Sequence, residues 1–203
     1  MAPTLPLVPK SRQIRIAALS EADAPSYRAL MLHAYEAAAD AFTSTPQERA
    51  AEPLSWWVAR LADPQGLSHA FGAFLGDELL GTVTLEFSAK AKTRHKAHLI
   101  GMFVAQAARG QGAGRALLQA AMRLAADRPG VRVVTLTVTE GNAPAIALYE
   151  ALGFERFGLE PMAIATPQGF KAKVHMWRDM RPAPAIGGAP NLRSAALAPR
   201  PDP

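Results

Sequence analysis

The chain has 203 residues and no cysteine, and 22 basic against 17 acidic side chains give it a formal charge of +5. The length suits one domain with tails or two very small domains, and 49% apolar residues are enough for a buried core. The lack of cysteine excludes disulfides, thiolate zinc sites, iron–sulfur clusters and a cysteine nucleophile. We see no apolar run of about 18 residues and no secretory signal, so we expect a cytoplasmic protein without a membrane partner.

Proline marks both ends of the chain, since nine of the 17 prolines lie in residues 1–11 and 182–203. We interpret residues 1–11 as a flexible segment and residues 182–203 as a disordered tail rich in proline and alanine. One domain over residues 12–181 lies between them.

The first half of this domain begins with a strand over residues 12–19, where Ile14 and Ile16 share a face. Ser20 and the acidic residues that follow it predict the start of a helix that extends to about Ala39. A second helix is expected from about residue 53 until Asp63-Pro64 ends it.

Three strands follow. Two β-rich runs within residues 69–89 are separated by Gly76-Asp77, which predicts a hairpin, and a third strand is expected over 95–104. Their short connections predict antiparallel pairing. The loop before the third strand holds a basic cluster, which is either a solvated loop or a contact to a phosphate group or an acidic partner: Lys90, Lys92, Arg94 and Lys96.

After residue 104 a glycine-rich turn leads into a helix over 115–127, and a β-branched strand covers 131–138. This order is one βαβ unit. A further helix over 144–152 and a last strand pair, 154–159 and 170–178, complete an α+β fold: a mostly antiparallel mixed sheet with flanking helices.

The glycine-rich turn runs from Arg109 to Gly114 and can bind an anion, because glycines permit close approach and first-turn amides lack intrahelical partners. A P-loop is excluded, since Arg115 follows Gly114 where that motif needs lysine. A dinucleotide fingerprint is disfavoured because the third glycine comes one residue early. The glycines could also serve only a tight turn.

Two segments resemble signatures of the GCN5-related N-acetyltransferases. The segment VAQAARGQGAGRALL is similar to that family's Q/R-x-x-G-x-G/A motif, with Arg109, Gly112 and Gly114 in its fixed places. The downstream NAPAIALYEALGF matches the next signature through Asn142, Leu148-Tyr149 and Gly153-Phe154. The resemblance covers about residues 12–180 and implies one acetyl-CoA-dependent domain.

The resemblance also implies where acetyl-CoA binds. The strands at 98–104 and 131–138 would splay apart, and the pantetheine arm would enter between them. The residues implied in cofactor binding are Met102, Phe103, Val104, Arg109, Gly110, Gln111, Gly112, Ala113, Gly114, Arg115 and Asn142. Asn142 could instead be a helix cap, and the two roles are compatible.

The implied reaction is direct transfer of the acetyl group to a primary amine of a small molecule, peptide or protein. Tyr149 occupies the family's usual general-acid position; the alternative is a tyrosine that only packs in the core. For the base that deprotonates the amine, Glu86 and His98 remain alternatives, because the family's frequent carboxylate on the strand over 94–104 is missing here. Scattered histidines indicate no metal site.

The acceptor is not identified by the sequence. Glu36 and Asp40, expected on one helix face, could attract a cationic amine or form a solvated acidic surface, and Phe170, His175 and Trp177 could line the acceptor side. A non-catalytic acyl-CoA-binding or sensing module is the alternative function. Nucleic-acid binding is disfavoured, because no basic stripe with interleaved aromatic residues is present. A homodimer is possible.

Overall fold

The computed structural model describes residues 13–180, and both predicted tails lie outside them. It contains one seven-stranded sheet in the order β1-β2-β3-β4-β5-β7-β6. Only β4 and β5 pair in parallel, and every other neighbouring pair in the sheet is antiparallel. The strands are β1 (Ile14–Ala18), β2 (Ser68–Leu75), β3 (Glu78–Phe87), β4 (Lys96–Val104), β5 (Val133–Thr139), β6 (Glu155–Thr166) and β7 (Gly169–Asp179).

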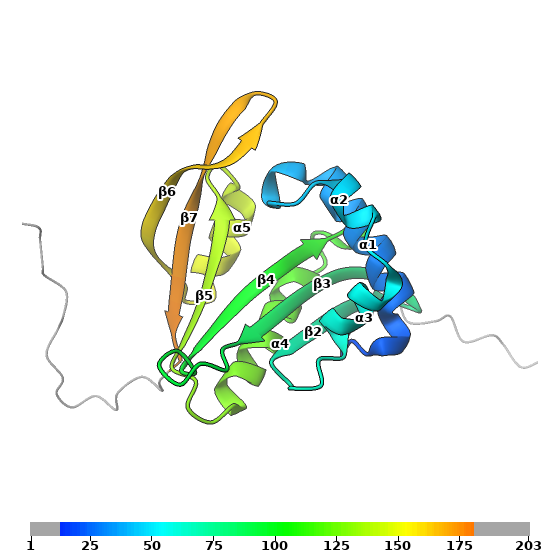
Figure 1. Ribbon diagram of the computed structural model, residues 1–203, viewed down its shortest axis with the longest axis horizontal. Helices are drawn as coiled ribbons and strands as arrows, with labels where there is room; N and C mark the ends of the chain where they lie inside the picture. Colours follow the sequence, from blue (N-terminus) through cyan, green and yellow to red (C-terminus); the bar gives the residue numbers. More distant parts are fainter. Residues whose placement is uncertain (1–12, 181–203) are drawn as a thin grey trace, which may run out of the picture.

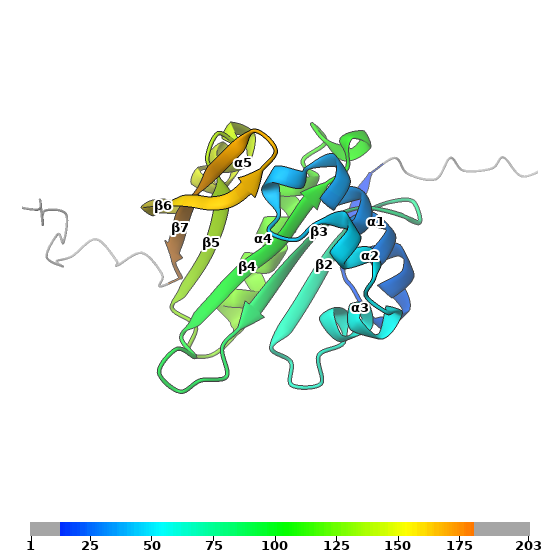
Figure 2. The same cartoon turned by 45° about the horizontal axis from the view of Figure 1, so that its top comes forward.

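The helices cover both faces of the sheet. They are α1 (Ala24–Ala37), α2 (Pro46–Ala50), α3 (Leu54–Leu61), α4 (Ala113–Asp127) and α5 (Ala143–Glu150), with short 3-10 turns at η1 (Glu21–Asp23), η2 (Ala39–Ala41) and η3 (Gln106–Ala108). Helices α1 and α3 pack on β3 and β2, whereas α4 packs across β1 to β4 (Figures 1 and 2). The predicted α+β fold with one βαβ unit is therefore confirmed.

Local sequence explains where the helices begin. The backbone N–H and the hydroxyl of Ser20 both donate to the Asp23 carboxylate, at 2.8 Å each, which fixes the predicted start ahead of α1. Helix α4 buries Leu117, Leu118 and Ala121 at helical spacing, all at 0% exposure. Burial of this apolar stripe against the sheet holds the first turn of α4 beside the end of β4.

Strands β4 and β5 pair over only half of their length. Their register runs from Lys96–Val133 to Leu99–Leu136 and then stops, although β4 continues to Val104. Gly101, at φ +61°, lies in a bulge of β4 where the pairing with β3 shifts register. Figure 1 shows the two strands side by side at one end of the sheet and diverging toward the other. The predicted splay is confirmed, and the bulge gives it a local cause.

Three details differ from the sequence-based expectations. The first helix ends at Ala37, so Asp40 lies in the separate turn η2 and shares no helix face with Glu36. The short helix α2 was not predicted at all. Strand β6 extends to Thr166 rather than ending at 159, because an irregular segment between Glu160 and Ile164 re-enters the pairing with β7.

The basic cluster at 90–96 is exposed and lies at the start of β4, whereas the glycine-rich turn follows the end of this nine-residue strand. The two segments are therefore separated by the length of β4 and do not share a ligand site. No helix within residues 13–180 is both long and apolar enough to span a bilayer.

Candidate active site

Two cavities meet where β4 and β5 part. One, of about 600 Å³, is lined by the glycine-rich turn and is called here the glycine-turn cavity. The other, of about 370 Å³, is lined by residues of α1, α2 and α3 and is called the helix-side cavity. Both cavities are bordered by Phe42, Met102, Asn142, Ala145 and Tyr149. A molecule seated in the glycine-turn cavity could therefore present a reacting group to one seated in the helix-side cavity.

The glycine-rich turn needs glycine for its backbone conformation. Gly110 and Gly112 have φ of +73° and +79°, in the left-handed region that side chains with a Cβ rarely adopt. A Cβ added at either position would meet no atom within 4 Å, so the space beside both glycines is open. The turn thus presents bare backbone to the cavity.

Behind this turn, α4 begins with no side-chain cap at its N-terminal residue Gly112. The first intrahelical bond is donated by Ala116 to Gly112, so the amides of Ala113, Gly114 and Arg115 have no partner within the helix. These amides and the positive end of the helix dipole favour an anionic group such as a pyrophosphate.

The side chains of the turn lie at its rim. Arg109 and Arg115 line the glycine-turn cavity, and Arg109 Nε donates to the Val104 carbonyl at 3.0 Å. Gln111 is exposed, does not line this cavity and donates to the Ala107 carbonyl at 2.7 Å, which braces the turn. Of the eleven predicted cofactor residues, ten line the cavity and Gln111 alone does not.

Gly114 has a different role from the other two glycines. Its φ is not positive, but an added Cβ would lie 3.1 Å from Leu148 Cδ2 and 3.3 Å from Met102 Cε. Gly114 therefore allows α4 to approach both α5 and β4 closely. This close packing positions the free amides of α4 beside the divergent end of β4.

Asn142 is the N-cap of α5, since its Oδ1 accepts a hydrogen bond from the Ala145 amide at 3.3 Å. The same residue borders both cavities. The cap reading of the sequence is confirmed, and the position at the junction leaves the second role, facing the pantetheine arm, as a prediction.

Tyr149 lies on α5 at the junction of the cavities and is 5% exposed. Its ring packs edge-on against Phe154, with centroids 5.9 Å apart. Burial raises the pKa of Tyr149 to about 12. The phenol is therefore protonated near neutral pH and can donate a hydrogen bond into the junction.

His98 lines the helix-side cavity, and Glu86 does not. Burial lowers the pKa of His98, while the Glu86 carboxylate, paired with it across β3 and β4, acts in the opposite direction. His98 Nδ1 and the Thr135 hydroxyl are hydrogen-bonded at 2.9 Å, and the same hydroxyl lies 3.4 Å from the Ala97 carbonyl oxygen. Where the hydroxyl donates to the carbonyl, Nε2 is the basic nitrogen of the neutral ring; where it donates to Nδ1, the roles of the two ring nitrogens are exchanged.

Sequence reasoning missed the residues that close the helix-side cavity opposite the sheet. Tyr35, Arg49 and Arg60 come from α1, α2 and α3. The signal for α2 was present in the sequence: Thr45 accepts from the Glu48 amide, Glu48 accepts from the Thr45 amide, and proline follows Thr45. That capping box identifies the short helix that carries Arg49.

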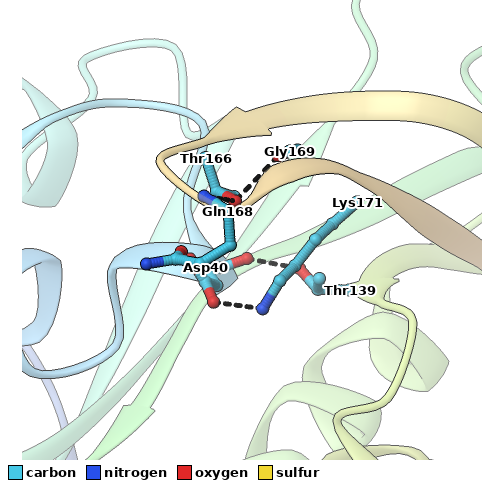
Figure 3. Close-up of polar contacts among 6 residues, drawn as sticks. All are labelled: Asp40, Thr139, Thr166, Gln168, Gly169 and Lys171. Atoms are coloured by element: carbon cyan, nitrogen blue, oxygen red, sulfur yellow. Dashed lines mark hydrogen bonds and ion pairs between the residues drawn. The ribbon is translucent and has the colours of Figure 1, made fainter.

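An ion pair between Lys171 Nζ and the Asp40 carboxylate connects β7 to the turn after α1 (Figure 3). Beside it, the Thr139 hydroxyl donates to the Asp40 carbonyl at 2.6 Å. The Asp40 carboxylate is thus occupied by Lys171 and is not directed at an amine acceptor. These contacts tie the β6–β7 hairpin to the helical side next to the cavities.

The remaining acceptor-side candidates do not line the cavities. Phe170 is 63% exposed, and neither Glu36 nor Trp177 borders either cavity. His175 pairs with Glu160 at 3.0 Å and shares the sheet face of His98, one strand beyond β5. Its neighbour in this face, Lys173, does line the helix-side cavity.

A divided sheet with free helix amides at one end of the gap and a buried phenol at its centre is the arrangement expected of an acetyl-CoA-dependent acyltransferase. The GNAT acetyltransferase family model matches residues 31–154, more than half of the chain. The chain therefore belongs to the GNAT acetyltransferase family, as the sequence signatures predicted.

Three individual relatives share 30% sequence identity or less with this chain. The L-amino acid N-acetyltransferase AaaT of Escherichia coli K12 is 30% identical over 99 residues, which are 49% of this chain and 60% of that protein. The chain thus matches less than two thirds of that relative. The ribosomal-protein-alanine N-acetyltransferase of Brucella melitensis is 26% identical with a TM-score of 0.67, covering 81% of this chain and 99% of that one.

A third relative is YncA of Salmonella typhimurium, described as a putative acetyltransferase and solved with acetyl-CoA. It is 20% identical, with a TM-score of 0.69 over 89% of this chain and 99% of that one. At this identity the likeness establishes the fold, and the family match supports acetyl-CoA as the acyl donor.

Proposed function

We propose that this protein is an N-acetyltransferase that transfers the acetyl group of acetyl-CoA directly to a primary amine. The observation that carries the proposal is the junction of the two cavities at Tyr149, with free helix amides in one and a half-buried histidine in the other. Two of the relatives above are named for N-acetylation, one of L-amino acids and one of a ribosomal protein's alanine, and both are amine acceptors.

The glycine-turn cavity fits acetyl-CoA. The open space beside Gly110 and Gly112 and the free amides of α4 suit the pyrophosphate, and Arg109 and Arg115 add positive charge at the rim. Beyond Leu99, β4 has no β5 partner, so its backbone groups can pair with the amides of the pantetheine arm. Acetyl-CoA supplies the thioester from which the acetyl group is transferred.

His98 is the group we assign as base. A lysine-like amine carries a proton at neutral pH, and removing it costs about 4.6 kcal/mol at pH 7, or about 1.4 kcal/mol for an α-amine with a pKa near 8. A neutral His98 ring can accept that proton directly or through water. Glu86 is placed to support the imidazolium that results, since it faces His98 from the next strand.

We assign Tyr149 as the hydrogen-bond donor to the departing CoA thiolate. Its phenol is protonated, lies at the junction and is fixed by packing on Phe154. A hydrogen bond donated by this hydroxyl stabilises negative charge on sulfur as it develops.

The first experiment is calorimetric titration of the protein with acetyl-CoA and with free CoA, followed by a thiol-release assay against a panel of primary amines. Micromolar binding and turnover with at least one amine are expected. Binding without turnover for any amine would favour a non-catalytic acyl-CoA sensor. No binding of either compound would contradict the assignment of the glycine-turn cavity.

A further inference from the structure

The helix-side cavity is cationic. Arg49, Arg60 and Lys173 line it, and no aspartate or glutamate is among its lining residues within the part of the chain that the structure describes. An acceptor amine must reach the His98 and Tyr149 end of this cavity. The positive charges of Arg49, Arg60 and Lys173 repel a second positive charge in this cavity and attract a negative one.

The two guanidinium groups are held against the same aromatic ring. The Arg49 and Arg60 guanidinium carbons lie 4.6 and 4.7 Å from the centroid of Trp56. Such stacking orients a guanidinium while its N–H groups remain available to an anion. Trp56 comes from α3, so the ring and Arg60 are one helical turn apart on one element.

Arg49 has one long ion pair, whereas Arg60 has none within residues 13–180. Arg49 donates from Nη2 to the Ser44 hydroxyl at 2.7 Å, its Nη1 lies 3.8 Å from the Glu52 carboxylate, and its Nε is buried without any hydrogen-bond partner. For Arg60 there is no carboxylate within 4.0 Å in residues 13–180. A half-buried guanidinium without an anion is costly unless a ligand supplies one.

Hydroxyl groups line the same cavity as this arginine pair. They come from Tyr35, Thr43 and Ser44. Burial raises the pKa of Tyr35, while the nearby Arg49 and Arg60 charges act in the opposite direction, which places its phenol close to both guanidiniums. Neutral hydroxyl donors beside two guanidiniums are typical of a site for a carboxylate or another oxyanion.

We propose that the acceptor is a small primary amine that also carries an anionic group, a carboxylate or phosphonate, which binds to Arg49 and Arg60 while the amine faces His98 and Tyr149. This inference rests on the proposed function. A cavity of about 370 Å³ is at the small end of ligand sites, which suits a free amino acid. Polyamines, which lack an anion, are expected to be poor acceptors.

The test compares acceptors that differ only in the anionic group. The probes are L-leucine and L-phenylalanine, their carboxamides, and the phosphonate analogue of leucine, assayed by thiol release with saturating acetyl-CoA. We expect kcat/KM for the acids to exceed that for the carboxamides at least 10-fold. This preference would oppose the lower amine pKa of the carboxamides, which favours the reactive neutral amine. Equal kcat/KM for acid and carboxamide would overturn the proposal, and a preferred phosphonate would identify the anion.

Variants of Arg60 test whether this residue causes the preference for acids over carboxamides. Arg60→Gln should lower kcat/KM for leucine about 10- to 100-fold and leave leucinamide unchanged, so the preference disappears. Arg60→Lys should retain part of it, because a point charge replaces the fork of the guanidinium. Arg123→Gln, an equal charge change on the exposed surface of α4, is the matched control and should behave as the unmodified protein. Equal losses for acid and carboxamide in Arg60→Gln would contradict the assignment.

A binding measurement separates this inference from the proposed function. N-acetyl-L-leucine and N-acetyl-L-leucinamide are titrated calorimetrically into the unmodified protein and the Arg60→Gln variant in the presence of CoA. Tighter binding of the acid, lost in the variant, supports the anion site even if no amine is acetylated. Equal or undetectable binding of both compounds refutes the site, whatever the outcome of the turnover assay.

Discussion

Removal of the Tyr149 hydroxyl tests the centre of the proposed mechanism. Burial raises the pKa of this phenol to about 12, whereas an ordinary thiol has a pKa near 8.5, so complete proton transfer to a thiolate is uphill by about 5 kcal/mol. The hydroxyl therefore acts mainly as a hydrogen-bond donor to the developing charge. Such a bond contributes about 1.5–3 kcal/mol. Tyr149→Phe should accordingly lower kcat about 10- to 150-fold without abolishing turnover.

The assay combines thiol-release kinetics with calorimetric binding of acetyl-CoA. The ring of Tyr149 still packs on Phe154 in the variant, so acetyl-CoA affinity and the melting temperature should change little. Tyr27→Phe is the matched control, because Tyr27 is 1% exposed, packs on Trp57 and borders neither cavity. A Tyr149→Phe protein as active as the control would reduce Tyr149 to a packing role.

The same variant has a second, independent signature at high pH. The folded protein keeps the Tyr149 proton up to about pH 12, whereas the unfolded chain loses it near pH 10, so the unfolded state binds fewer protons between these values. The free energy of unfolding should therefore decrease as pH rises through this window, by up to about 2.7 kcal/mol from this group. Denaturant titrations should show this contribution missing in Tyr149→Phe. An unchanged pH dependence would contradict the burial argument.

Three further predictions follow from the geometry. Gly112→Val should destabilise the protein by about 1–2 kcal/mol through strain at φ +79° and should also weaken acetyl-CoA binding. Gly112→Asn should weaken binding alone, because asparagine tolerates this φ. Calorimetry measures the change in binding, and melting curves measure the change in stability. His98→Gln should remove the acid limb of the pH profile of kcat/KM. Glu86→Gln should move that limb to lower pH, because it removes the charge that raises the pKa of His98. Loss of all activity in Glu86→Gln alone would identify the Glu86 carboxylate as the base. Asp40→Asn should change the unfolding free energy by less than about 1 kcal/mol, since the ion pair with Lys171 is partly exposed to solvent. A larger change in chemical denaturation would show that this ion pair holds the fold together.

The acceptor class has the widest consequence for the role of this protein. Free amino acids and protein N-termini are both amines, but only a free amino acid offers the α-carboxylate that Arg49 and Arg60 would bind.

The homodimer and the cytoplasmic location stay predictions. Light scattering of the purified protein would measure its oligomeric state.

Some features were readable from local sequence. The succession of strands and helices along the chain and the glycine-rich turn follow from hydrophobic periodicity and from glycines ahead of an amphipathic helix, and these patterns depend on residues within about ten positions of one another. The Asn142 cap is equally local. Tyr149 was placed by the family signature, and the structure adds the burial that fixes its protonation state.

Other features needed the folded chain. The length of the β4–β5 pairing depends on a bulge at Gly101 that the strand pattern does not reveal. The choice between His98 and Glu86 as cavity residues depends on which strand borders the gap, and both face the same side of the sheet.

The sequence by itself determined the fold class and the turn that suits a pyrophosphate, because both are set by neighbours along the chain. Only the tertiary structure decided that Arg49 and Arg60 line one cavity, and that no carboxylate of residues 13–180 lies within 4.0 Å of Arg60. In the sequence each is one basic residue on a helix, and a solvated surface charge would have the same pattern. Trp56 and Arg60 are one turn apart on α3, so their contact is local, but only the fold places Arg49 of α2 over the same ring.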